Sequence, residues 1–236
     1  MSAPTDPRLP FTLPPIIDQI RAILPDQEFH LVGGAVRDLL LGRPIHDYDL
    51  VLPSGGIRNA RRLADALHAA FYPLDEGRDT GRVLVPAGDG SSICIDIATY
   101  RRDGAPAGNS QPTLEDDLRG RDFTINAIAL NLRSIEIFDP LGGVHHLRDR
   151  ELHLCSPSAL ADDPVRLLRA VRLAVLLECR IPPSLFSEMK RQAPSLDGVS
   201  AERLRDELFR SLESSSPASC LRLLDLAGAL SRILPE

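Results

Sequence analysis

The sequence contains no tryptophan, and aromatic residues make up only 4% of its 236 residues. A core must therefore be built from Leu, Ile, Val and Ala, which a hydrophobic content of 43% permits in one large or two small domains. The four cysteines are far apart and have no CxxC spacing (Cys94, Cys155, Cys179, Cys220). This spacing argues against a zinc site and a disulfide framework, and predicts buried small hydrophobes or free thiols.

Long apolar runs are also missing, and none approaches the length of a membrane span. The N-terminal residues 1–15 are rich in proline and lack the basic and apolar regions of a secretory signal. These absences predict a cytoplasmic protein without membrane contact. The net charge of −6 argues against binding nucleic acid over the whole surface. It leaves room for one basic groove, because arginines cluster near 119–121, 166–172 and 203–210.

Hydrophobic periodicity predicts a mixed α/β first part and a helical second part. In the first part we expect strands at 29–32, 48–52, 71–74, 82–85 and 93–98, helices at 16–24, 36–41 and 57–70, a loop at 105–112, short helical segments at 114–118 and 124–127, and a hairpin at 128–132 and 135–138. In the second part we expect helices at 164–177, 183–192, 201–212 and 218–226. The change in texture predicts a domain boundary near residue 150, with domains 1–150 and 151–236.

The most informative stretch runs from Gly33 and Gly34 to Asp47 and Asp49. Side chains alternate along a strand, so Asp47 and Asp49 point to the same face. Two neighbouring carboxylates repel each other unless a cation lies between them, and Mg2+ prefers oxygen ligands together with a bound polyphosphate. A Gly-Gly turn before a short helix frees backbone N–H groups to face that polyphosphate. The arrangement predicts nucleotidyl transfer.

Asp96 lies within the apolar segment 93–98. A buried carboxylate without a partner is costly, so Asp96 needs a cation. One hypothesis makes it a third carboxylate of the same metal site. The alternative is a salt bridge to an arginine such as Arg101 or Arg102.

The run from Gly33 to Val51 resembles the signature of the class II CCA-adding enzymes and bacterial poly(A) polymerases, which are template-independent nucleotidyltransferases of the polymerase-beta superfamily. Four further segments resemble later motifs of that family in the same order: 121–127, 139–143, 162–166 and 201–208. The resemblance implies an α+β, polymerase-beta-like head with a mixed or antiparallel sheet, followed by an all-helical neck. It also implies addition of CMP or AMP to the 3' end of tRNA from CTP or ATP.

The resemblance assigns roles to individual residues. Asp47 and Asp49 would bind two Mg2+ ions, with Asp96 as a further catalytic carboxylate. The implied nucleotide-binding residues are Gly33, Gly34, Arg37 and Asp38 for the triphosphate, Arg121, Asp122 and Asn126 in the next motif, and Asp162, Asp163, Arg166, Arg169 and Arg172 in the base-selecting motif and its continuation. Glu202 and Arg205 are interpreted as structural pairs that hold the neck.

Asp163 and Arg166 are expected on one face of a helix, where a carboxylate and a guanidinium could pair with a base edge and replace a template. Taken alone, the same spacing is typical of a carboxylate near a helix N-terminus with an intrahelical ion pair.

Several departures from the family pattern leave alternatives open. Gly120 stands where the family has arginine, and Asp162 where it more often has glutamate. The segment between Tyr100 and Leu114 is short, which favours a CC-adding specialist. The body and tail domains that the resemblance implies after the neck are absent from this sequence, so RNA grip would depend on a homo-oligomer or a partner.

The other hypotheses are a poly(A) polymerase, an A-adding enzyme, a non-catalytic RNA-binding module and a small-molecule nucleotidyltransferase. Retention of all three acids argues against the binding module, because buried acids without a metal would only destabilise it. A small-molecule enzyme would have no need of Asp163 and Arg166 on a helical neck.

Overall fold

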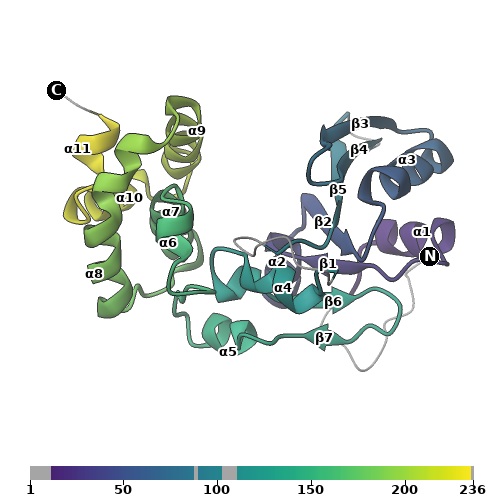
Figure 1. Ribbon diagram of the computed structural model, residues 1–236, viewed down its shortest axis with the longest axis horizontal. Coiled ribbons are helices and arrows are strands. Elements are labelled where there is room, and N and C mark those ends of the chain that lie inside the picture. Colours follow the sequence, from purple (N-terminus) through teal and green to yellow (C-terminus); the bar gives the residue numbers. More distant parts are fainter. Residues whose placement is uncertain (1–11, 88–89, 103–110, 235–236) are drawn as a thin grey trace. The chain divides into compact units, whose positions relative to one another are not determined.

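The first part of the chain forms a seven-stranded sheet in the computed structural model, which describes residues 12–87, 90–102 and 111–234 (Figure 1). The strands are β1 His30–Val32, β2 Asp47–Leu52, β3 Ala70–Asp75, β4 Thr80–Pro86, β5 Ser92–Thr99, β6 Ala129–Asn131 and β7 Ile137–Phe138. Their order is β3-β4-β5-β2-β1-β6-β7. Within this sheet β2 and β5 run parallel and the other neighbouring strands antiparallel. The predicted α+β class with a mixed sheet is confirmed.

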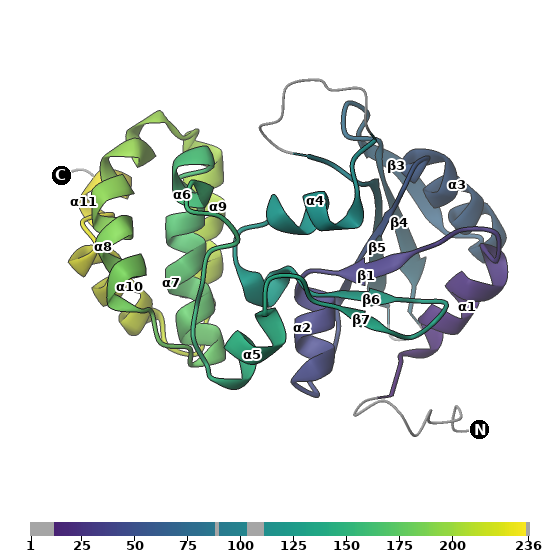
Figure 2. The ribbon, with the colours of Figure 1, turned by 60° about the horizontal axis from the view of Figure 1, so that its bottom comes forward.

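Three helices complete the core of this sheet: α1 Pro15–Ile23, α2 Gly34–Leu40 and α3 Gly56–Leu67. Helix α2 contacts β1 and β2, whereas α3 lies along β3, β4 and β5 (Figure 2). The core that they share is aliphatic, as the shortage of aromatic residues predicts. Two short elements, α4 Leu114–Arg119 and η1 Thr124–Asn126, precede the β6–β7 hairpin.

Helix α3 receives its N-terminal cap from a distant residue. The Asp79 carboxylate accepts hydrogen bonds from the backbone N–H groups of Gly55, Gly56 and Ile57 at 3.0, 2.8 and 3.0 Å. These are donors that a helix leaves unsatisfied at its start. A Cβ atom on Gly56 would lie 1.9 Å from the Asp79 carbonyl oxygen, so only glycine fits there. The cap fixes the start of α3 against the β3–β4 turn.

A buried polar chain crosses the sheet at β1. The Tyr100 hydroxyl lies 2.9 Å from Nδ1 of His30, and the Asn131 amide nitrogen lies 3.2 Å from Nε2 of His30 and 3.1 Å from the Glu28 carboxylate. Burial lowers the pKa of His30 and outweighs the opposing effect of Glu28. His30 is therefore held as the neutral imidazole.

We expect this histidine to make folding sensitive to mildly acidic pH. The folded pKa lies below the unfolded value of 6.5, so the unfolded chain binds more protons as pH falls below that value. Stability is therefore full above 6.5 and is lost as pH falls towards the folded pKa. Thermal unfolding at pH 7.5 and 5.5 should show a smaller drop in Tm for His30→Gln than for the wild type. His46→Gln, at an exposed position, is the control and should behave like the wild type; equal pH dependence in all three would contradict the assignment.

The second part of the chain is helical, as predicted. Its helices are α5 Gly143–Arg148, α6 Ala159–Asp162, α7 Arg166–Leu177, α8 Pro183–Gln192, α9 Ala201–Leu212, α10 Pro217–Leu226 and α11 Leu230–Ile233, with η2 Ala193–Gly198. Helix α7 is the most buried of them and contacts α6, α9 and α10. The four predicted helices are confirmed, whereas α5, α6, α11 and η2 are too short for a periodic signal.

One predicted boundary in this part is wrong. The helix expected at 164–177 begins at Arg166, and Asp163 has an extended backbone with φ −148° and ψ 96°. Asp163 precedes Pro164, whose ring disfavours the helical conformation of the residue before it. Asp163 and Arg166 therefore do not belong to one helix.

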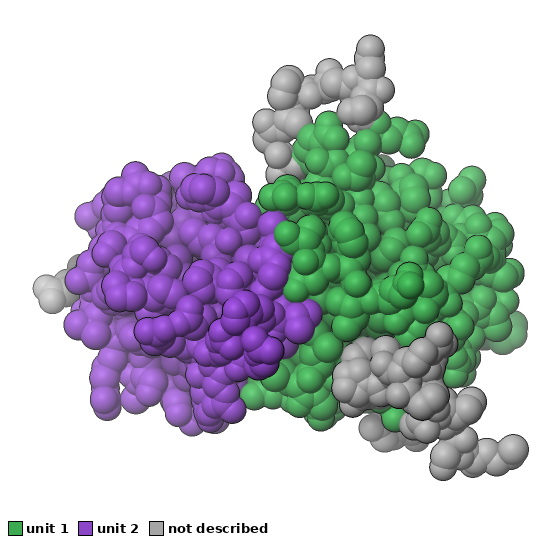
Figure 3. Space-filling view, turned by 90° about the horizontal axis from the view of Figure 1, so that it is seen from below, with its two compact units in different colours: residues 1–120, 126–140 green, residues 121–125, 141–236 purple. Residues whose placement is uncertain are grey.

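The chain divides into two compact units, coloured separately in Figure 3. Unit 1 comprises residues 1–120 and 126–140, and unit 2 comprises 121–125 and 141–236. The functional domains 1–150 and 151–236 stay a prediction. The expected loop at 105–112 lies largely outside the described residues.

The described cysteines are free thiols, three of them buried and Cys94 partly buried, as predicted. In the part of the chain that the structure describes, no helix is both long and apolar enough to cross a membrane.

Candidate active site

Three carboxylates meet on neighbouring strands of unit 1. Asp47 and Asp49 are two residues apart on β2 and share a face. Strand β5 pairs with β2 in parallel, and this register places Asp96 opposite Asp49 and Cys94 opposite Asp47. The juxtaposition that the sequence suggested for Asp96 is therefore present.

Cys94 reports the charge of this group. Burial raises the pKa of its thiol to about 11, and the charges of Asp96, Asp47 and Asp49 add to the rise against the opposing effect of Arg82. A negative field from all three acids thus reaches a single side chain. A cation placed among these acids would be stabilised by the same field.

Asp96 also has a partner inside the protein. Arg82 on β4 lies opposite Asp96 in the register and donates Nε and Nη2 to its two oxygens, both at 2.6 Å. This bidentate pair raises the pKa of Arg82. The salt bridge considered for Asp96 therefore exists, but its partner is Arg82. Arg101 and Arg102 contact Asp117 and Asp116 instead.

The donor set fits Mg2+ as a two-carboxylate site. Asp47 is exposed and Asp49 half-buried, so their oxygens can be reached from solvent. Mg2+ is commonly held by one or two carboxylates together with substrate phosphates and water. Within residues 12–87, 90–102 and 111–234, no group of three or more His, Cys, Asp and Glu side chains is arranged to hold a metal by itself.

The Gly-Gly turn lies at the same edge of the sheet. Val32, the last residue of β1, pairs with Asp49, and Gly33 follows at once. Gly33 has φ +73° and ψ −144°, a conformation that favours glycine. A Cβ atom on Gly34 would lie 3.2 Å from Nη2 of Arg37. Both glycines are thus needed to turn the chain beside the carboxylates.

Arg37 occupies the interior behind this turn. It is 7% exposed, and its guanidinium donates to both oxygens of Asp38 at 3.0 and 2.8 Å and to Oδ1 of Asn126 at 2.7 Å. Three of the predicted nucleotide-binding residues are therefore brought together. Their observed contacts hold α2 to the end of η1, and direct contact with a triphosphate stays a prediction.

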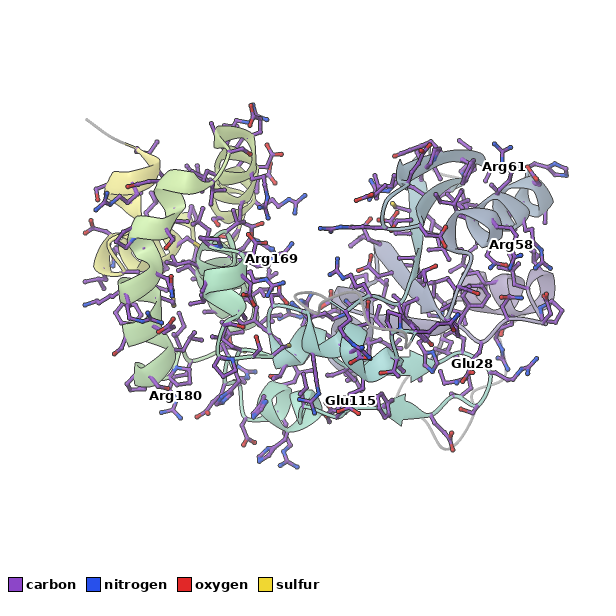
Figure 4. The ribbon with its side chains drawn as sticks, in the orientation of Figure 1. Glu28, Arg58, Arg61, Glu115, Arg169 and Arg180 are labelled. Atoms are coloured by element: carbon purple, nitrogen blue, oxygen red, sulfur yellow. The ribbon has the colours of Figure 1, made fainter. Side chains whose placement is uncertain are left out.

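Unit 2 gathers a second group of predicted residues around a buried ion network. Arg169 on α7 donates to Asp122 at 3.0 Å and lies 4.0 Å from Glu207 on α9. Arg172, one turn further along α7, donates to Glu207 as well. Burial alone would lower the pKa of Arg169, but the charges of Asp122 and Glu207 outweigh it and raise the pKa. Figure 4 labels Arg169 on its helix.

Glu207 is the functional residue that the sequence analysis missed. It is 4% exposed, whereas Glu202 and Arg205, which were interpreted as the pairs holding the neck, are both exposed. Arg205 pairs with its neighbour Asp206. The interpretation of Glu202 and Arg205 was therefore wrong, although Glu207 lies in the same motif.

Asp163 is held by α9 rather than by its own segment. Arg203 donates Nη2 to Oδ2 of Asp163 at 2.8 Å. The other oxygen, Oδ1, is buried and has no hydrogen-bond partner among the described residues. A buried acceptor without a donor is unusual, and it can take a hydrogen bond from a ligand.

Asp162 and Arg166 flank Asp163. Asp162 ends α6 and accepts a hydrogen bond from the Ser158 hydroxyl at 2.8 Å. Arg166 begins α7, and its Nη1 donates to the backbone carbonyls of Ala159 and Arg121 at 3.3 and 3.4 Å. Arg166 thereby connects the predicted base-selecting segment with the segment that carries Arg121 and Asp122.

Unit 1 thus has the architecture of a polymerase-beta-like head, and helical unit 2 that of the neck. Residues 29–153 match the family described as the poly A polymerase head domain, and residues 180–236 match the probable RNA and SrmB-binding site of polymerase A. The chain belongs to the family of the poly A polymerase head domain, which also contains tRNA nucleotidyltransferases.

Curated relatives and solved structures agree with this placement. The chain is 39% identical over 202 residues to the CC-adding tRNA nucleotidyltransferase of Geobacter sulfurreducens, covering 86% of this chain and 44% of that protein. It is 39% identical over 220 residues to the multifunctional CCA protein of Xanthomonas campestris, covering 89% and 51%.

A tRNA nucleotidyltransferase solved with a primer tRNA and an incoming ATP analogue superimposes with a TM-score of 0.79 at 28% identity, covering 93% of this chain and 62% of that one. The chain spans about half the length of the curated relatives that it matches.

Proposed function

We propose that this chain is the catalytic part of a tRNA nucleotidyltransferase that transfers CMP, AMP or both from CTP and ATP to the 3' end of tRNA. The observation that carries the proposal is the Asp47–Asp49 pair beside the Gly33 turn, set by the pairing of Val32 with Asp49. A cytoplasmic location, where tRNA substrates are found, belongs to the same proposal.

The reaction joins the tRNA 3'-oxygen to the α-phosphorus of the nucleotide and breaks the bond from that phosphorus to the bridging oxygen, so pyrophosphate leaves. Asp47 and Asp49 would hold two Mg2+ ions, which lower the pKa of the 3'-hydroxyl and neutralise charge on the leaving group. The turn at Gly33 and Gly34 offers backbone N–H groups to the triphosphate. Arg37 and Asn126 keep that turn in place.

The unit 2 residues support recognition of the nucleotide. Oδ1 of Asp163 accepts from an exocyclic amino group, which both cytosine and adenine carry, and Arg166 donates to the base edge. Asp122 already accepts from Arg169 and from the Phe123 N–H at 2.7 Å. We therefore give ribose and phosphate contact to Arg121, with Asp122 as its positioning residue.

Asp96 has two candidate roles that one variant pair separates. In Asp96→Asn the Arg82 guanidinium loses its charged partner, and in Arg82→Gln/Asp96→Asn that loss is repaired. If Asp96 acts only through Arg82, the double variant recovers the activity that the single variant loses. We expect no recovery, with kcat at least tenfold down in both variants, because Asp96 lies directly opposite Asp49. Full recovery in labelled CTP incorporation would make Asp96 a structural residue.

The function is tested by incorporation of labelled CTP and ATP, with Mg2+, into tRNA transcripts ending before CCA, after C and after CC, with oligo(A) as a further primer. CTP on the first two alone identifies a CC-adding enzyme. ATP on the CC-ended tRNA alone identifies an A-adding enzyme, and both together full CCA addition. Processive ATP addition to oligo(A) identifies a poly(A) polymerase. A folded chain that incorporates neither nucleotide into any RNA overturns the proposal.

A further inference from the structure

Helix α3 presents arginines on the face turned away from the sheet. Its buried side chains Asn59, Ala60, Leu63 and Ala64 face the core of unit 1. Arg58, Arg61 and Arg62 are exposed on the outer side, and Arg58 and Arg61, three residues apart, lie one turn from each other. Figure 4 labels Arg58 and Arg61 on this helix.

Arg58 and Arg61 differ from the other arginines of unit 1. Most of those contact a carboxylate within the unit: Arg21, Arg37, Arg62, Arg78, Arg82, Arg101, Arg102 and Arg119. In the described part of the chain, by contrast, no carboxylate lies within ion-pair distance of Arg58 or Arg61. Two guanidinium groups thus remain uncompensated in a protein whose net charge is −6.

The surroundings hold this charge in place. The Arg61 guanidinium carbon lies 4.7 Å from the centroid of the Phe71 ring on β3, which orders the side chain before any ligand arrives. Arg62 is neutralised by Asp26 at 3.1 Å. Asp65, also exposed on this face, makes no ion pair with Arg61 or Arg58. The face therefore keeps a positive excess at Arg58 and Arg61.

We propose that Arg58 and Arg61 bind phosphates of the tRNA backbone, a contact that rests on the proposed function. Arginine offers forked donors that match phosphate oxygens. Contacts to phosphate fix a nucleic acid without reading its sequence. An enzyme that extends many different tRNAs needs such a sequence-neutral grip. The overall negative charge confines attraction to local sites of this kind.

The test is the salt dependence of tRNA binding by the whole chain. Wild type, Arg58→Gln/Arg61→Gln and the control Arg62→Gln are compared by filter binding to a tRNA transcript lacking CCA, between 50 and 200 mM salt. Each lost phosphate contact reduces the slope of log K against log[salt] by about 0.7–0.9, so the double variant should lose about 1.4–1.8 of slope. Its Kd should rise roughly 10- to 30-fold near physiological salt.

Kinetics provide the second readout. The double variant should raise KM for tRNA and leave KM for CTP and the melting temperature unchanged. Arg58→Lys/Arg61→Lys should keep most of the slope, since lysine preserves the charges. An unchanged slope in the glutamine double variant, or an equal loss in Arg62→Gln, would overturn the inference while CMP transfer by the wild type still supports the function. A wild-type chain that neither binds tRNA nor transfers CMP would overturn both.

Discussion

Replacing Asp47 or Asp49 by asparagine is expected to lower kcat for CMP transfer by roughly 10³-fold or more, which corresponds to about 4 kcal/mol of transition-state stabilisation. Asparagine keeps the size of the side chain and removes the charge that holds Mg2+. Incorporation of labelled CTP into a tRNA lacking CCA measures the effect, and chelation of divalent cations should abolish the wild-type activity as well.

The same variants should fold normally. Asp47 and Asp49 share one face of β2, so their charges repel each other when no cation is present. In the presence of a chelator, Tm of either asparagine variant should therefore equal or exceed that of the wild type. Asp18→Asn, at an exposed acid that pairs with Arg21, is the control and should retain full activity. Activity above a tenth of wild type in both active-site variants would exclude a metal role for the pair.

Replacing Glu207 by glutamine is expected to destabilise the protein by about 3–5 kcal/mol, because it removes one partner of a buried ion network. Arg172 and Arg169 would then keep their charges beside Asp122 alone. Glu207 is 4% exposed, so solvent cannot replace the lost carboxylate. In a chain of this size, that cost lowers Tm by roughly 6–15 °C, which thermal unfolding measures.

Asp206→Asn is the matched control for this prediction. It removes the neighbouring acid on α9, whose pair with Arg205 is exposed on both sides, and such pairs contribute little. Its Tm should stay within about 2 °C of the wild type. Equal shifts for Glu207→Gln and Asp206→Asn would show that the network contributes nothing beyond surface charge.

Much of the fold followed from local sequence. The strand that carries Asp47 and Asp49, the Gly33 turn and the four long helices of the second part all have strong short-range signals. The extended backbone at Asp163 also had one, since the following Pro164 disfavours a helix at that position. The helix predicted from 164 onward gave hydrophobic spacing more weight than the proline.

The partners of the acids could not be predicted in the same way. Arg82 faces Asp96 only because β4 and β5 pair in one particular register, whereas Arg101 and Arg102 were closer in sequence. Glu207 rather than Glu202 is buried because of the face that α9 turns towards α7. Strand order and helix orientation are set by tertiary packing, and these determine which charges meet.

The division of the chain into units has a consequence for proteolysis and for dissection of the protein. Residues 121–125 belong to unit 2, although the sequence on both sides of them belongs to unit 1. A single cut therefore cannot separate the units. Cleavage near residue 150 would leave Asp122 on one fragment and both Arg169 and Glu207 on the other, so the smaller fragment would carry two arginines of the network with only one of its acids.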